Sequence, residues 1–404
     1  MIIQPRTWGF ICTTAHPAGC AANVREQIAR ARAGGGRSDG PRRVLVIGAS
    51  TGYGLAARIQ AAFGFGASTL GVFLEKPATA RKSASAGWYN AAAFEDAARQ
   101  AGLTSVSLNA DAFAHATRER AIELIERELG GPVDLVIYSL AAPARRLPDS
   151  GDTVRTTLRP IGEAFAGTTI DTEKDRLARI RVEPADAPDI ANTVAVMGGE
   201  DWRLWIDALA ASDMLAPDAR TVAFSYLGPE LTWPIYRHGT IGRAKAHLEQ
   251  SARALCTQAG REDFARVAIL KSIVTQASAA IPVIPLYLSV VSRVLRERGL
   301  DEAAIDQQAR LFHDFLYPRS GTARVDADGR LRLDERELAA DIQDACKALW
   351  PRINDDNLFE LTDYADYKRR FLNLFGFERD DIDYAADVDP QVDFAPIQNR
   401  PVSD

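Results

Sequence analysis

Two side chains that could act on a carbonyl group, Tyr236 and Lys245, lie close together in the chain. A phenol can donate a proton or a hydrogen bond to a carbonyl oxygen as negative charge develops on it. A nearby ammonium favours the phenolate and so lowers the pKa of the phenol. The same ammonium can also hold the ribose of a nucleotide. The pair therefore predicts chemistry at a carbonyl oxygen, and the alternative is a packed tyrosine beside a solvated lysine.

The spacing of these two residues limits where they can stand. They are nine positions apart, and at about 100° per residue they would point to opposite sides of one regular helix. Gly239 and Thr240 lie between them, Thr is a good N-cap residue, and Pro234 favours a non-helical entry. We therefore expect Tyr236 on a loop that folds back over Lys245, which stands on the second turn of a helix beginning near Thr240.

A second phenol, Tyr226, directly follows an apolar run at 221–225 that we expect to be a strand. A tyrosine at the end of a buried strand can line the site of a substrate carbonyl, or it can pack with its hydroxyl on water. Tyr226 is therefore predicted to contact substrate, with packing as the alternative.

The glycine-rich stretch Gly48-Ala-Ser-Thr-Gly52-Tyr-Gly54 follows a β-branched, apolar run at 44–47. That run predicts a buried parallel strand, and residues 55–63 predict a helix. Glycines allow a tight turn and close approach of a pyrophosphate, whose oxygens meet free N–H groups at the helix start. Since no Gly-Lys-Ser/Thr follows, the stretch predicts a dinucleotide site rather than a Walker loop. Together with the tyrosine and lysine, it predicts a reductase that uses a nicotinamide cofactor.

Polar residues follow the next expected strands. Glu75 comes after the run 69–73, and a carboxylate there can accept hydrogen bonds from the adenosine ribose while repelling a 2′-phosphate. This favours NADH over NADPH, although the adjacent Lys76 weakens the argument. Asp111 follows the run 106–108, where it can meet the adenine amino group. Ser139 and Leu140 follow the run 133–138, where their backbone can pass the ribose.

Expected strands and helices alternate along most of the chain. The strands are 44–47, 69–73, 106–108, 133–138, 221–225 and 267–270, and the helices are 55–63, 118–129, 202–211 and 240–258. This alternation predicts an α/β protein with one doubly wound parallel sheet and helices on both faces. Ligands of such sheets bind outside the carboxyl ends of the strands. We therefore expect a single domain over residues 1–404.

Three segments stand outside this pattern. Residues 1–40 form an N-terminal extension, and residues 31–38 within it look like a flexible connector. Residues 145–195 are rich in Thr, Arg and Asp and look like an inserted hairpin with loops. Residues 330–404 look helical and end in an acidic tail that carries proline.

Composition excludes several classes of protein. The 404 residues are 47% hydrophobic and 25% charged, which is typical of a soluble globular protein. A net charge of −6 argues against a nucleic-acid partner, which requires a basic surface. Four cysteines do not indicate a disulfide scaffold, and the first residues lack the pattern of a signal peptide. We therefore expect a cytoplasmic protein.

The most apolar stretch, 273–291, contains polar residues and is interrupted by Pro282 and Pro285. This favours a core helix or a flexible wall over an apolar substrate, and it disfavours a membrane span. Cys12, His16 and Cys20 are metal-ligand types without a fourth partner at the spacing of a zinc site, so no metal is expected. Acyl hydrolysis is disfavoured because no Gly-x-Ser-x-Gly sequence occurs.

Taken together, these residues resemble one family nearly end to end. The stretches 9–20, 48–54, 73–77, 226–234 and 274–282 are similar to those of FabV-type enoyl-acyl-carrier-protein reductases and the related trans-2-enoyl-CoA reductases. The Tyr-x8-Lys spacing is the specific signal. Short-chain dehydrogenases in general have Tyr-x3-Lys, and the better-known enoyl reductases have Tyr-x6-Lys.

The resemblance implies a Rossmann-like fold of an enlarged short-chain dehydrogenase type, often monomeric. It implies NADH-dependent reduction of the C2=C3 double bond of trans-2-enoyl thioesters carried by acyl-carrier protein or CoA, the last step of fatty-acid elongation. Hydride would reach C3, Tyr236 would stabilise the enolate as proton donor, and Tyr226 would bind substrate. The implied cofactor contacts are Gly48, Ala49, Ser50, Thr51, Gly52, Tyr53, Leu74, Glu75, Asp111, Ala112, Ser139, Leu140, Lys245, Val274, Thr275 and Gln276.

Two other functions remain open at this point. A β-ketoacyl or other carbonyl reductase of the short-chain type would use the same cofactor and tyrosine with an added serine, for which Ser225 is available. A non-catalytic NADH-binding protein could be built on the same sheet, although the intact Tyr236 and Lys245 pair argues against it.

Overall fold

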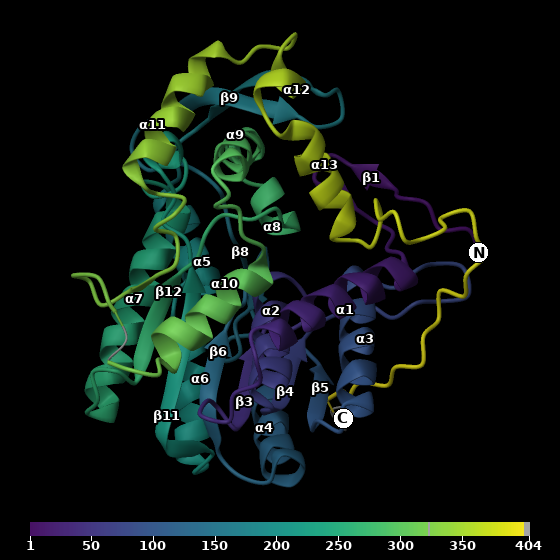
Figure 1. Cartoon of the computed structure of the whole chain (residues 1–404). Coiled ribbons are helices and arrows are strands. Elements are labelled where there is room, and N and C mark those ends of the chain that lie inside the picture. Colours follow the sequence, from purple (N-terminus) through teal and green to yellow (C-terminus); the bar gives the residue numbers. More distant parts are fainter. Residues whose placement is uncertain (322–323, 400–404) are drawn as a thin grey trace.

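The computed structural model describes residues 1–321 and 324–399, and a parallel sheet runs through its centre (Figure 1). In the described residues the sheet has seven strands in the order β13-β12-β11-β6-β3-β4-β5, each pairing parallel with its neighbours. Their bounds are β3 Arg43–Ile47, β4 Ser68–Phe73, β5 Ser105–Asn109, β6 Val133–Tyr138, β11 Leu215–Ser225, β12 Ala265–Ile269 and β13 Leu331–Arg332. The predicted doubly wound α/β architecture is confirmed.

Helices cover both faces of the sheet because alternate residues of the strands point in opposite directions. Leu45 and Ile47 of β3 pack with one set of helices, whereas Val44 and Val46 pack with the other. The first set is α4 His115–Leu124, α6 Glu200–Ala211 and α7 Thr240–Ala259. The second set is α2 Gly52–Ile59, α3 Ala86–Gln100, α1 Pro17–Ala33 and α10 Ala304–Arg310.

Several expected bounds were wrong by a few residues. The helix after the glycine stretch begins at Gly52, so Gly52 and Gly54 lie within it, and it continues as a π-helix at Gln60–Gly64. The helix expected at 118–129 begins at His115 and ends in a π-helix at Ile125–Leu129. The strand expected at 221–225 begins at Leu215, and a register shift before Arg220 separates its two paired parts.

The segments outside the alternating pattern are more ordered than predicted. The supposed connector at 31–38 begins inside α1, and the side chain of Arg37 is buried. Its Nε and Nη2 donate to the carboxylate of Asp39, and Nη2 also donates to the carbonyl of Tyr317. The supposed single hairpin at 145–195 contains two hairpins and a helix: β7 Ala144–Arg146 with β8 Thr153–Arg155, β9 Phe165–Asp171 with β10 Arg176–Val182, and α5 Ala187–Met197.

The C-terminal segment is helical as predicted, with α11 Ala340–Leu349, α12 Leu358–Leu361 and α13 Tyr364–Asn373. It also adds β13 to one edge of the sheet, which the sequence did not indicate. At the opposite edge, Ile397 exchanges backbone hydrogen bonds with Ser107 and Asn109 of β5. Figure 1 shows the yellow tail returning past α3 toward β5. The last five residues of the expected tail, 400–404, lie outside the described residues.

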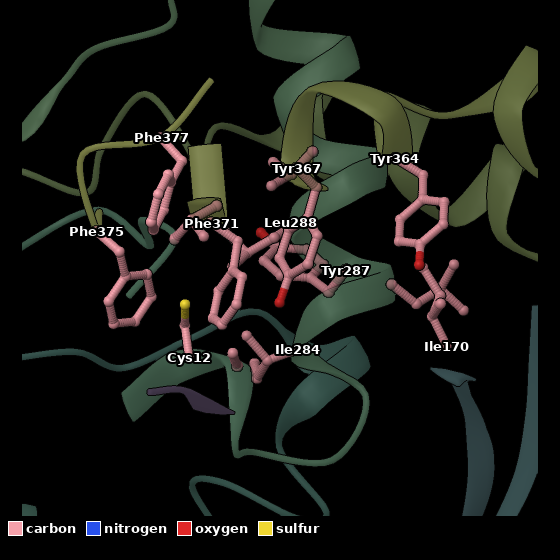
Figure 2. Packing of buried hydrophobic residues seen from close by; sticks show 14 of the residues in the cluster. Cys12, Ile170, Ile284, Tyr287, Leu288, Tyr364, Tyr367, Phe371, Phe375 and Phe377 are labelled. Atoms are coloured by element: carbon pink, nitrogen blue, oxygen red, sulfur yellow. The ribbon is translucent and has the colours of Figure 1, made fainter. Parts of the chain in front are cut away.

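A second apolar layer lies beyond one end of the sheet. Figure 1 shows α9 with α11, α12, α13 and the β9 strand at the top of the molecule, with α8 below them. The bounds are α8 Gln276–Ala279 and α9 Ile284–Glu297, and the N-terminal hairpin is β1 Thr7–Trp8 with β2 Ile11–Cys12. Figure 2 shows aromatic side chains of α9 and α13 packed together there. Within the described residues, no helix is both long enough and apolar enough to span a bilayer.

A buried guanidinium anchors α2 to the sheet beneath the glycine stretch. The side chain of Arg58 has no exposed surface and donates to Thr69, Ser107 and Glu95 at 3.3, 2.9 and 2.9 Å. Its guanidinium also lies 4.3 Å from the ring centroid of Phe94. These partners compensate for the cost of burying the charge.

We expect Gly71→Ala to destabilise the protein, because the added methyl would lie 2.5 Å from Arg58 Nη1 and 2.9 Å from the Ala49 Cβ. Overpacking of this kind lowers the free energy of unfolding by about 1–3 kcal/mol. Gly36→Ala is the matched control, since its methyl meets nothing within 4 Å. Urea denaturation midpoints measure both, and equal midpoints would contradict the packing described for Arg58.

Candidate active site

The carboxyl ends of β3 and β6 lie side by side, where the strand order of the sheet reverses direction. The turns that follow them are in close contact. A Cβ on Gly48 would lie 2.2 Å from the carbonyl oxygen of Ser139, and a Cβ on Gly54 would lie 2.0 Å from the carbonyl oxygen of Gly48. Gly48 also has φ +87°. Glycine is therefore required at these positions, and the turn lies where parallel sheets of this kind bind ligands.

The helix that follows begins at this turn, so its first N–H groups face the end of the sheet. Thr51 is its exposed N-cap residue, and Gly52 has φ +54°. Thr275 lies beside this turn, since a Cβ on Gly52 would be 3.9 Å from its methyl carbon. The side chain of Tyr53 is already engaged within the protein, because its hydroxyl donates to the carbonyl of Lys271 at 2.7 Å. Its phenol therefore binds protein, and its backbone is what faces the turn.

The predicted ribose carboxylate, Glu75, lies just past β4. The hydroxyl of Ser50 donates to Glu75 Oε1 at 2.7 Å, so the glycine turn and the carboxylate are directly linked. Burial raises the pKa of Glu75, and hydrogen bonds from serine hydroxyls oppose that shift. Gly87 leaves room for the carboxylate, because a Cβ there would lie 2.0 Å from Oε1. The neighbouring side chain of Leu74 is 69% exposed, which leaves an apolar surface beside the acid.

The residues after β5 and β6 lie at the same end of the sheet. Asp111 Oδ1 accepts the N–H of Phe113 at 3.0 Å. The carbonyl of Ala112 accepts the indole N–H of Trp205 at 3.1 Å, so it already has a protein partner. The Ser139 N–H donates to the carbonyl of Ile47 at 2.8 Å and ties its strand end to β3. Leu140 is half-buried against the apolar cluster of α4, α6 and α7.

The catalytic candidates have the predicted placement in the chain. Tyr236 lies on the loop before α7, and Lys245 lies on the second turn of that helix. The carbonyl of Tyr236 accepts the N–H groups of Gly239 and Gly242 at 3.2 and 3.1 Å, which holds the loop against the helix start. One detail was wrong: Gly239 is the N-cap residue, and the hydroxyl of Thr240 instead donates to the carbonyl of Thr157.

Electrostatics at this pair differ from the prediction. Burial raises the pKa of the Tyr236 phenol, whose side chain is 6% exposed, so the expected lowering by Lys245 is wrong for this structure. Burial also lowers the pKa of Lys245 to about 8, although the residue keeps part of its surface exposed. Desolvation disfavours the charged form of each group, and this effect dominates both shifts.

Tyr226 packs against Tyr236, with ring centroids 5.3 Å apart and an interplanar angle of 67°. The edge-to-face arrangement brings the two predicted phenols together. Sequence reasoning missed the acid behind them, Glu337, whose Oε1 accepts the Tyr226 hydroxyl at 2.9 Å. Glu337 stands more than a hundred positions away in the chain, in a stretch without a recognisable motif, so no local signal could have identified it.

The apolar stretch 273–291 forms α8 and the first part of α9, whose buried residues belong to the core, so the expectation of a core helix is confirmed. Val274 is 9% exposed, Gln276 is exposed, and Thr275 and Ser278 form a capping box at the start of α8. Val283 has φ +73°, which is unusual for a β-branched residue, at the junction of α8 with α9. The buried face of α9 then packs on α13 (Figure 2).

A group of three or more His, Cys, Asp or Glu side chains arranged for a metal ion does not occur among the described residues. Cys12, Cys20, Cys256 and Cys346 are all free thiols.

Comparison with known proteins places this site in a family. A family model described as "Trans-2-enoyl-CoA reductase catalytic region" matches residues 82–317, and one described as "NAD(P)H binding domain of trans-2-enoyl-CoA reductase" matches residues 2–80. The chain belongs to the trans-2-enoyl-CoA reductase family. A third model of the family, described as "Enoyl reductase FAD binding domain", matches residues 325–388.

Similar proteins cover nearly the whole chain. An enoyl-[acyl-carrier-protein] reductase [NADH] from Xanthomonas axonopodis pv. citri (strain 306) is 59% identical over 98% of this chain and 100% of its own length. The crystal structure of Treponema denticola trans-2-enoyl-CoA reductase in complex with NAD has a TM-score of 0.93 at 42% identity, covering 98% of this chain and 100% of that chain. The Clostridium trans-2-enoyl-CoA reductase in complex with NADH has a TM-score of 0.93 at 39% identity, covering 96% and 98%.

The residues of 325–388 do not fit a flavin site in this structure. Their enclosed acids already bind protein donors: Asp334 pairs with Arg332 at 2.7 Å, and Asp363 pairs with Arg296 at 2.8 Å. Their aromatic side chains pack against α9 in the apolar cluster. The reaction proposed below therefore involves no flavin.

We expect Lys245 to titrate with a midpoint at about pH 8, because burial lowers its pKa to about 8. Its amine should react with an acylating reagent once deprotonated, whereas an exposed lysine has a pKa of about 10.4. Competitive labelling across a pH series, read by peptide mass spectrometry, measures the midpoint, and Lys245→Arg identifies the labelled position. A midpoint near that of an exposed lysine would show that the side chain is not desolvated.

Proposed function

We propose that the protein is an NADH-dependent enoyl thioester reductase that reduces the C2=C3 double bond of trans-2-enoyl groups. The observation that carries this proposal is the contact of Tyr226 with Tyr236 on the loop before α7, in a chain that belongs to the trans-2-enoyl-CoA reductase family. The curated relative at 59% identity is named for NADH and acyl-carrier protein, and the related crystal structures are named for CoA substrates with NAD or NADH.

The residues at the sheet end fit a dinucleotide. The turn of Gly48 and Gly54 permits close backbone approach, and the start of α2 supplies N–H groups to a pyrophosphate. Glu75 can accept the adenosine ribose hydroxyls, and the exposed Leu74 offers an apolar surface to the adenine. We assign the cofactor contacts to Gly48, Ala49, Ser50, Thr51, Gly52, Tyr53, Leu74, Glu75, Asp111, Ala112, Ser139, Leu140, Lys245, Val274, Thr275 and Gln276.

Tyr53 and Ala112 take part in this assignment in a restricted way. The Tyr53 phenol and the Ala112 carbonyl already hydrogen-bond to Lys271 and Trp205. Tyr53 therefore has no hydroxyl proton left to donate to the cofactor, although its oxygen can still accept a hydrogen bond, and the Ala112 carbonyl has one lone pair left to accept one.

NADH, when bound, supplies the hydride for C3 of the enoyl group. Negative charge then develops on the thioester oxygen, and Tyr236 donates a hydrogen bond or proton to that oxygen. The raised pKa of Tyr236 keeps the phenol protonated at neutral pH, so the donor is present before the reaction begins. Lys245 in its ammonium form holds the ribose and supports the phenol. The enolate then takes a proton at C2, drawn in net from solvent, so that the C2=C3 bond gains one hydride and one proton.

The acyl chain needs an apolar wall, and the α8–α9 region provides one. Ile284 and Leu288 of α9 face Phe371 of α13 in Figure 2, and the Tyr367 hydroxyl points into this group, where none of the described residues hydrogen-bonds to it. A groove of about 370 Å³, lined in part by residues 279–282 and by Ile170, lies next to this cluster. We assign the groove to the acyl chain of the substrate, with the cluster as the packed layer beside it.

The carbonyl-reductase alternative has weaker support. Ser225, the serine available to it, is buried, and its hydroxyl has no hydrogen-bond partner among the described residues. A serine that assists carbonyl reduction would be expected to reach the catalytic tyrosine or the substrate.

We expect Tyr236→Phe to lower kcat/KM for NADH and crotonyl-CoA by about 10²–10⁴, the usual contribution of a positioned proton donor. Tyr317→Phe is the control, because that phenol packs with Phe65 and Arg220 away from Tyr226 and Tyr236. Rates of NADH oxidation with crotonyl-CoA, with crotonyl carrier protein and with β-ketoacyl-CoA show which of these thioesters the protein reduces. If Tyr236→Phe stays within about threefold of the parent, the assigned role is wrong.

We expect Glu75→Gln to relax cofactor choice. The amide keeps the size that Gly87 accommodates but removes the charge that would repel a 2′-phosphate. The ratio of kcat/KM for NADPH to that for NADH should rise at least about tenfold, equivalent to about 1.4 kcal/mol. Steady-state rates with each cofactor test this, and an unchanged ratio would remove Glu75 from the ribose site.

A further inference from the structure

Glu337 is a buried carboxylate directly behind Tyr226, in the stretch between β13 and α11. Its side chain has no exposed surface. Oε1 accepts hydroxyls from Tyr226 at 2.9 Å, Tyr287 at 2.8 Å and Ser272 at 2.8 Å, and Oε2 accepts the Ser272 N–H at 2.6 Å. Donors from three separate parts of the chain therefore converge on one acid.

These contacts suit the ionised acid, because a carboxylate only accepts hydrogen bonds. The N–H of Ser272 is a fixed donor, and a proton on Oε2 would oppose it. Burial raises the pKa of Glu337, whereas the hydrogen bond from the Ser272 N–H and the charge of Lys271 oppose that shift and favour the charged form. Four donors to a buried charge are the compensation that such burial requires.

The bond to Glu337 restricts what Tyr226 can do. A phenol has one proton, and the Tyr226 hydroxyl donates it to Glu337. Toward the substrate, Tyr226 therefore presents its ring and oxygen lone pairs, and a thioester oxygen cannot donate to them. The Tyr236 hydroxyl, in contrast, keeps its proton available, because it has no hydrogen-bond partner among the described residues.

We propose that Glu337 is a positioning residue: by accepting the Tyr226 proton it fixes the ring against which Tyr236 packs and leaves Tyr236 as the phenol that donates to substrate. This inference rests on the proposed reduction of enoyl thioesters. It assigns the two phenols different tasks, and it explains why an acid from the C-terminal segment reaches the carboxyl end of β11.

The test is Glu337→Gln in the full-length protein, assayed with NADH and crotonyl-CoA. The amide keeps the shape of the acid but replaces one acceptor by a donor and removes the charge. We expect kcat to fall at least about tenfold with the KM for crotonyl-CoA within about threefold, because the orientation of Tyr236 matters most in the transition state. In a Tyr226→Phe background, Glu337→Gln should change kcat by less than about twofold, because the contact through which it acts is gone.

Ser272→Ala is the control for general loss of structure, since it removes another hydroxyl from the same Oε1 while keeping the charge and the Tyr226 bond. We expect its kcat to stay within about threefold of the parent. An equal loss from Glu337→Gln in the parent and Tyr226→Phe backgrounds would overturn the proposal, because it would show a structural role alone.

If Glu337→Gln does not fold, the variants Tyr226→Phe and Ser272→Ala test the proposal instead. Tyr226→Phe should lower kcat about tenfold, whereas Ser272→Ala should not, and equal kcat values for the two variants would overturn the proposal. Parent protein that fails to oxidise NADH with crotonyl-CoA would instead contradict the proposed function. The two failures are therefore distinguishable.

Discussion

The contact between the turns after β3 and β6 is the constraint on which the site depends. The chain passes so close at Gly48 that a methyl group there would overlap the carbonyl of Ser139. This contact fixes the start of α2 at the point where the strand order reverses, and with it the direction of the free N–H groups. Gly54 packs onto Gly48 in turn, and Thr275 meets the turn from α8. A ligand at this point therefore contacts segments from three distant parts of the chain.

The C-terminal segment completes the molecule in ways that the alternating pattern does not suggest. It pairs with β12 through β13 at one edge of the sheet, and Ile397 pairs with β5 at the other, so β12 and β5 both have a partner on their outer side. Between these two contacts it supplies α13 to the apolar wall and Glu337 to Tyr226. Sheet edge, wall and buried acid therefore come from one continuous stretch, which couples the integrity of the fold to the geometry of the phenols.

The sequence predicted what depends on local pattern, and it failed where distant contacts decide. Strand 133–138 and the placement of Tyr236 and Lys245 were predicted correctly, because apolar runs, glycines and helical periodicity act over a few residues. β13 could not be predicted, because two residues are too few to show a periodic pattern and the strand exists only through its pairing with β12. Arg37 was taken for part of a connector because its partners, Tyr317 and His313, are far away in the chain. Glu337 was missed for the same reason.

Burial shifts the pKa values of the proposed site residues more strongly than the charges of neighbouring residues do. The sequence suggested that Lys245 would favour the Tyr236 phenolate, but desolvation raises the pKa of the phenol and lowers that of the lysine to about 8. The same cause raises the pKa of Glu75 and of Glu337. A proton donor benefits from this arrangement, because the phenol keeps its proton at neutral pH, whereas a preformed phenolate would have none to give. The ammonium of Lys245 is the group that burial weakens, so a bound anion beside it would restore the charge that the protein interior disfavours.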